Sequence, residues 1–173
     1  MPGSKVCESC GQGHDEQGHC GCSKFADGTL ITAKAVDIPL LEIKACPEGG
    51  FWNHSGVTKK KGVAIQVTCL GGRWAASSEN KPTSGDGDQR FSGGDESLLS
   101  SAPTGALLAK VGGDNDGAGS AVFHIGKNGW IPAELEGNIW LAANFKKDEI
   151  PKSVGAVYVI ISDENFYING LLA

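Results

Sequence analysis

Residues 63–70 read VAIQVTCL, in which apolar and polar side chains alternate. This alternation is typical of a β-strand with one buried face, because successive side chains of a strand point to opposite sides of its sheet. Cys69 keeps step with the valines and the isoleucine of this run, so we expect it to be a reduced thiol in the core. We expect the same of Cys46, which also lies in an apolar segment, with a disulfide between the two strands as the alternative.

Further strands are predicted on both sides of this one. They cover residues 105–112 (GALLAKVG), 121–126 (AVFHIG), 138–143 and 154–161, with one or two more in 30–46 and a last strand or docked tail at 166–173. Residues 77–104 are polar and rich in Gly, Ser and Asp, and so long a connection marks a functional or partner-facing loop. Short strands joined by Gly-rich turns predict an all-β chain that folds as a β-sandwich.

Length and net charge limit the number of domains and the kinds of partner that this chain can have. The chain has 173 residues and a formal net charge of −5. We expect a Cys-rich arm at 1–28 and one sandwich domain at 29–173. The acidic balance argues against a nucleic-acid partner, which requires a basic face. No apolar run is long enough to span a membrane and no apolar leader opens the chain, so we expect a cytoplasmic protein, with unconventional export left open.

The strongest chemical signal is the spacing Cys7-x2-Cys10-x9-Cys20-x-Cys22. Two cysteine pairs, each close in sequence, can converge on one ion, and tetrahedral zinc accepts four thiolates. A zinc ion with four thiolates has no open position, so this knuckle would be structural. An iron–sulfur cluster, which also uses four cysteines, is the alternative metal centre, and an arm without metal is the third reading.

Several short motifs follow one another in order along the rest of the chain. They are Trp52-x-x-Ser55-Gly56-Val57, Lys61-Gly62, Gly71-Gly72-x-Trp74, GALLAKVG (105–112), FHIG (123–126) and Gly137-Asn138-Ile139-Trp140-Leu141 with Asn144. On these motifs, residues of about 49–161 resemble the PA-IL-like galactose-binding lectin domain. The resemblance implies a small jelly-roll-like β-sandwich in which Trp52, Trp74 and Trp140 are core residues.

The resemblance is weakest where that family binds calcium and galactose. Its calcium ligands come from an Asn-Asp pair and a following loop rich in Asn and Thr, and the matching segment here is NFKKDEIPKSVG, residues 144–155. Asn144 matches, but Phe145 stands in place of the Asp, and Lys and Ser occupy two later Asn positions. Asp148 and Glu149 offer oxygens, yet the neighbouring lysines would repel a divalent cation. We therefore expect no calcium, and Asn144, Asp148 and Glu149 mark the edge of any rebuilt sugar site.

Other polar residues do not form a recognisable catalytic site. No nucleophile elbow, phosphate loop or His-Glu-x-x-His motif occurs, so we do not expect an enzyme. The acidic clusters at 86–88 and 114–116 lack the later ligands of an EF-hand and are interpreted as turns. Trp130 precedes Pro132 on a predicted turn and is the tryptophan best suited to anchor a partner.

These observations favour a non-catalytic accessory subunit of a larger protein assembly. The metal-bound arm and the loop at 77–104 would supply its contacts, together with Trp130. A galactose-type lectin with a rebuilt site is the first alternative, with carbohydrate as its partner. An iron–sulfur electron-transfer subunit is the second.

Overall fold

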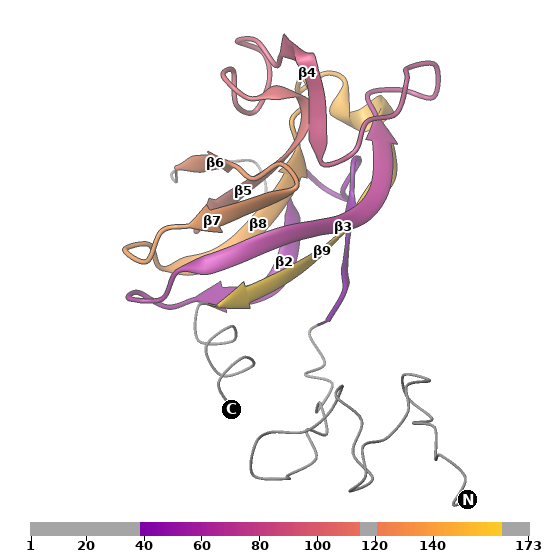
Figure 1. Ribbon diagram of the computed structural model, residues 1–173. Helices are drawn as coiled ribbons and strands as arrows, with labels where there is room; N and C mark the ends of the chain where they lie inside the picture. The colour runs from indigo at the N-terminus through magenta and orange to yellow at the C-terminus, as the bar shows by residue number, and fades with distance from the viewer. Residues whose placement is uncertain (1–38, 115–120, 164–173) are drawn as a thin grey trace, which may run out of the picture. The chain divides into compact units, whose positions relative to one another are not determined.

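The computed structural model describes residues 39–114 and 121–163 (Figure 1). The arm at 1–28 with Cys7, Cys10, Cys20 and Cys22, its boundary at 28/29 and the segment 166–173 lie outside the described residues. The described chain is all-β apart from one turn of 3-10 helix, η1 (Ile150–Lys152). Its strands are β1 (Leu41–Lys44), β2 (Asn53–Lys59), β3 (Ile65–Ala75), β4 (Asp86–Ser92), β5 (Pro103–Val111), β6 (Val122–His124), β7 (Asn128–Ile131), β8 (Gly137–Ala143) and β9 (Val154–Asp163).

The strands form two antiparallel sheets, which confirms the predicted β-sandwich. One sheet has the order β1-β9-β3-β7, and the other has the order β2-β8-β5-β4 with β6 also paired to β5. The central pairs join segments far apart in sequence: β3 pairs with β9 from Ile65↔Asp163 to Ala75↔Val154. Figure 1 shows the long β3 running beside β9 and bending upward toward β4. Within the described ranges, no helix is long and apolar enough to cross a membrane.

The main core lies between the sheets and takes its side chains from both. Val67 of β3 and Val157 of β9 meet Leu107 of β5 and Ile139 of β8 in one buried cluster. Cys69 is 7% exposed and belongs to this cluster, as predicted. Burial raises the pKa of its thiol, because a thiolate would lose its hydration in the core.

Cys46 contradicts the prediction of a core thiol. β1 ends at Lys44 and Ala45 is still buried in the core, but the next residue, Cys46, lies at the surface with its thiol 3.8 Å from the Pro151 carbonyl oxygen. Both Cys46 and Cys69 are free, so the alternative disulfide is also wrong.

The predicted core tryptophans do not all occupy the same layer. Trp74 is 1% exposed and lies between the sheets. Trp52 is also buried, but it belongs to a second cluster against which Trp140, only partly buried, packs. The buried ammonium of Lys110 lies 4.9 Å from the ring of Trp52 and 5.5 Å from that of Trp140. A lysine held over two aromatic faces is stabilised by cation–π attraction.

The sequence patterns do not reveal β2, β4 and β7. β4 reads DGDQRFS and falls inside the predicted loop at 77–104. It is a terminal strand whose residues are mostly exposed, so it lacks the apolar alternation of a half-buried strand. Trp130 lies on β7 rather than on a turn, and it is 50% exposed, which agrees with the predicted exposure.

Candidate functional site

A backbone bridge returns the chain to the end of β3 and sets up the candidate site. The Trp74 N–H donates to the Thr83 carbonyl at 3.0 Å, and the Thr83 N–H donates to the Trp74 carbonyl at 2.8 Å. This bridge closes residues 75–82 into a loop and leads the chain directly into β4. Because β4 pairs with β5, the residues that follow are held at the margin of the second sheet.

Gly87 lets β4 approach β5 closely. Its φ is +73°, and a Cβ there would come within 2.5 Å of the Ala106 nitrogen and 2.7 Å of the Thr104 carbonyl oxygen. A side chain at this position would push the strand away. The glycine therefore determines where the next residue, Asp88, stands.

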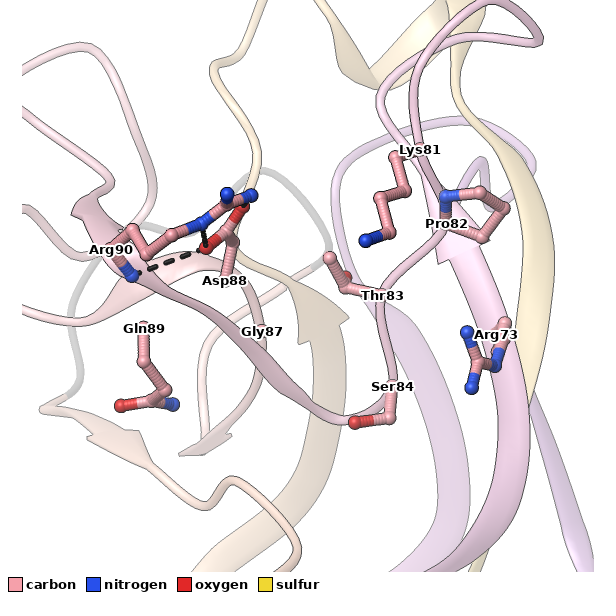
Figure 2. Close-up of a pocket in the computed structure, with 9 residues that line it drawn as sticks. All are labelled: Arg73, Lys81, Pro82, Thr83, Ser84, Gly87, Asp88, Gln89 and Arg90. Atoms are coloured by element: carbon pink, nitrogen blue, oxygen red, sulfur yellow. Dashed lines mark hydrogen bonds and ion pairs between the residues drawn. The ribbon is translucent and has the colours of Figure 1, made fainter.

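Two adjoining pockets lie along β4 and share Lys81, Thr83 and Asp88. The first has a volume of about 330 Å³ and is completed by Arg73, Pro82, Ser84, Gly87, Gln89 and Arg90 (Figure 2). The second has a volume of about 290 Å³ and is completed by Ala75, Ala76, Asn80, Phe91, Thr104, Phe145 and Glu149. We call the two pockets together the β4 groove. Its walls come from the loop after β3, from β4 and from the segment before η1.

A fixed carboxylate stands where the two pockets meet. Arg90 binds Asp88 with two hydrogen bonds, from Nε to Oδ1 at 2.9 Å and from Nη2 to Oδ2 at 2.8 Å. The Arg90 backbone N–H also donates to Oδ1 at 3.1 Å. These bonds lower the pKa of Asp88 to about 2. A carboxylate has about four acceptor sites, so Asp88 keeps capacity for a ligand donor.

Glu149 is the residue of the predicted sugar edge that lines the groove. Its Oε2 accepts the Lys146 backbone N–H at 3.2 Å. Asn144 is completely buried, and its amide donates to the carbonyls of Leu99, Ala102 and Pro103. Asp148 is exposed and does not line the groove.

Phe145 occupies the position where the family resemblance expects an aspartate. Its side chain is 3% exposed and packs edge-on against Trp74, with 6.4 Å between ring centroids. An apolar ring here supplies core packing and no oxygen ligand. Among the residues that the structure describes, no group of three or more His, Cys, Asp or Glu side chains is placed to hold a metal ion.

The sequence patterns indicate Glu149 and a functional loop at 77–104, but they do not single out Arg73, Lys81 or Asp88. Asp88 belongs to the acidic cluster at 86–88, which is interpreted from the sequence as a turn. Asp86 and Asp88 both have protein partners: Asp86 Oδ1 accepts the Lys127 backbone N–H at 2.8 Å. In the sequence, Arg73, Lys81 and Arg90 lie in and beside a Gly-rich segment, and this was the available signal for a basic pocket. Spacing along the chain alone does not show that these side chains share a surface. Trp130 does not line the groove.

A third pocket of about 300 Å³ lies elsewhere, beside Trp52, His54 and Trp140. His54 Nδ1 accepts the Gly56 N–H at 2.9 Å, and its ring meets Trp140 edge-on at 4.7 Å. These interactions hold the aromatic rings in place along the pair β2 and β8.

No protein-family model and no curated protein matches this chain. Among solved structures, it is similar to the N-terminal domain of EclA, a PllA-like lectin. The two chains are 22% identical, with a TM-score of 0.51, and the match covers 72% of this chain and 95% of that one. The likeness shows a shared fold and confirms the lectin-like sandwich that the sequence motifs indicate.

Proposed function

We propose that this lectin-like sandwich binds a saccharide in the β4 groove without catalysing a reaction. The observation that supports it best is the Asp88 carboxylate, held by Arg90 at the junction of two pockets. Asp88 and Glu149 offer acceptors for sugar hydroxyls, and Asn80 offers both a donor and an acceptor. The ring of Phe91, which is 60% exposed, offers an apolar face at the same groove. Concave sites with a few convergent polar groups are typical of small-ligand binding.

We propose that this binding needs no calcium. Phe145 places a buried ring at the expected ligand position. The Asn144 side chain is already used in hydrogen bonds to the loop at 97–103. Lys81 lines the groove and would repel a divalent cation there. Hydrogen bonds from fixed side chains would then hold the sugar directly.

A glycan array followed by titration calorimetry on the full chain tests the proposal. We expect galactose-containing or related glycans to bind equally with and without a calcium chelator. Asp88→Asn should weaken binding at least about tenfold, since the carboxylate acceptor is lost. Asp95→Asn, which changes an exposed carboxylate that does not line the groove, is the matched control. The proposal would be refuted if no glycan on the array binds, or if Asp88→Asn binds as tightly as Asp95→Asn.

A second proposal keeps the accessory-subunit function. It is supported by Trp130, a large aromatic side chain that is 50% exposed on β7, the last strand of its sheet. Native isolation should then recover a fixed-ratio partner, and Trp130→Ala should release it. Leu40→Ala changes an exposed apolar side chain outside the loop at 77–104 and should leave the partner bound. A chain that is isolated alone would contradict this proposal.

A further inference from the structure

The pocket of the β4 groove drawn in Figure 2 is basic, although the chain has a net charge of −5. Three cationic side chains line it, those of Arg73, Lys81 and Arg90, against the single carboxylate of Asp88. Arg90 neutralises that carboxylate through two hydrogen bonds. Within the described part of the chain, the Arg73 and Lys81 side chains make no ion pair. The charge of Lys81 also acts on Asp88, and the pocket as a whole carries three cations against one carboxylate, so its net charge is positive.

The remaining polar groups of this pocket add donors, although Gln89 Nε2 gives one of its two hydrogens to the Asp86 carbonyl at 2.6 Å. Figure 2 shows the Ser84 hydroxyl and the Gln89 amide on facing walls, with the Lys81 ammonium above them directed toward the Asp88–Arg90 pair. The Ser84 oxygen lies 3.4 Å from the Asp86 backbone nitrogen and can accept its N–H, so its own hydroxyl hydrogen is available to a ligand. Arg90 uses two of its five guanidinium N–H groups on Asp88, which leaves others for a ligand.

We infer that the saccharide bound in the β4 groove is acidic and that its anionic group, a carboxylate or a sulfate, binds at Arg73 and Lys81. This inference rests on the proposed function and names the class of ligand. The sugar ring would lie in the second pocket, against Glu149 and Phe91, with its anionic group in the first. Charge-assisted hydrogen bonds are about twice as strong as neutral ones, so the anion would dominate selectivity.

Two matched probes test the inference on the full chain by titration calorimetry. Trigalacturonate and the galactotriose of the same linkage differ only in the exocyclic carbon, which is a carboxylate in one and a hydroxymethyl group in the other. We expect the acidic probe to bind at least about tenfold more tightly, and added salt to reduce this preference. A sulfated galactotriose is the third probe, and tighter binding of this probe than of trigalacturonate would identify sulfate as the preferred anion.

Charge-removing variants locate the anion. Arg73→Gln and Lys81→Gln should each lower the ratio of trigalacturonate affinity to galactotriose affinity several-fold. Lys60→Gln removes an exposed lysine that does not line the groove and should leave both affinities unchanged. All three positions are exposed, and circular dichroism checks that the variants fold.

The outcomes separate this inference from the proposed function. Equal binding of the neutral and acidic probes, with both lost in Asp88→Asn, would overturn the acidic ligand and support the saccharide site. Binding of inorganic sulfate as tight as that of trigalacturonate would overturn the acidic saccharide in favour of a simple anion site. If no saccharide of either charge binds, the proposed function fails and this inference fails with it.

Discussion

The indole Nε1 of Trp74 donates a hydrogen bond to the carbonyl oxygen of Gly105 at 2.7 Å. Trp74 lies on β3 and Gly105 on β5, so this buried bond joins the two sheets of the sandwich. Gly105 has a φ of +75°, and a Cβ there would come within 2.6 Å of Thr83 Oγ1 and 3.2 Å of the Phe145 ring. Thr83 and Phe145 also line the second pocket of the β4 groove, so the groove lies directly against the core.

Trp74→Phe should lower the free energy of unfolding by about 2–4 kcal/mol, because it loses buried area and leaves the Gly105 carbonyl without its donor. Chemical denaturation measures the change. Trp130→Phe is the control, since that side chain is half-exposed and should change stability by less than about 0.5 kcal/mol. Equal stabilities of the two variants would contradict the role of Trp74.

Phe145→Asp restores the residue that the lectin resemblance expects. We predict a loss of at least about 3 kcal/mol, because a carboxylate would replace a ring that is 3% exposed and packs on Trp74. Thermal unfolding with and without calcium checks it. Phe91→Asp, at an exposed ring of the same groove, should be tolerated. A calcium-dependent recovery of stability in Phe145→Asp would show that a latent calcium site exists.

Asn144→Ala should destabilise the chain by about 2 kcal/mol or more. The side chain donates to three backbone carbonyls and accepts the Leu99 N–H at 3.0 Å. Its removal would leave these buried backbone groups without their hydrogen-bond partner. The loop at 97–103 should become the first site of cleavage in limited proteolysis. Asn138→Ala, at an exposed position on β8, provides the comparison. If Asn144→Ala leaves the cleavage pattern unchanged, the Asn144 side chain does not hold the loop at 97–103 in place.

The ion pair of Asp88 and Arg90 predicts a specific pH dependence. The pKa of Asp88 falls from its ordinary 3.8 to about 2 because Arg90 hydrogen bonds the carboxylate. The pair therefore contributes to stability in full above pH 3.8, and the contribution is lost as the pH falls through about 2. Carboxyl-carbon NMR titration should report this low pKa, and Arg90→Gln should return it toward 3.8. An Asp88 that titrates normally in the wild-type chain would exclude the pair in solution.

The four N-terminal cysteines carry a prediction that rests on sequence spacing. Elemental analysis of the full chain should find zinc in equimolar amount, and replacement of Cys7 and Cys10 by serine should remove it. The chain should be colourless. A brown protein with iron and sulfide in place of zinc would support the electron-transfer alternative. A metal-free wild-type chain, prepared under reducing conditions, would overturn both.

Much of the sandwich follows from local pattern. Alternation at 63–70 predicts β3, because a buried sheet face demands apolar side chains at every second position. The apolar run at 105–112 predicts β5, which is buried on both faces and is therefore apolar along most of its length. The ordered motifs around Gly72, Trp74 and Trp140 also indicate the lectin-like fold, which the similar solved structure confirms. The exposed strand β4 and the surface position of Cys46 could not be predicted from the sequence, since neither follows from local hydrophobicity.

The β4 groove was decided by tertiary structure. Asp88 and Glu149 are far apart in sequence. The pairing of both β4 and β8 with β5, together with the bridge from Trp74 to Thr83, brings them to one groove. The sequence determined the residue types, the alternation of apolar and polar side chains, and the presence of an apolar ring at Phe145. The structure determined which polar side chains share a surface, because long-range strand pairing, and not local composition, sets the distances at which charges and hydrogen-bonding groups meet.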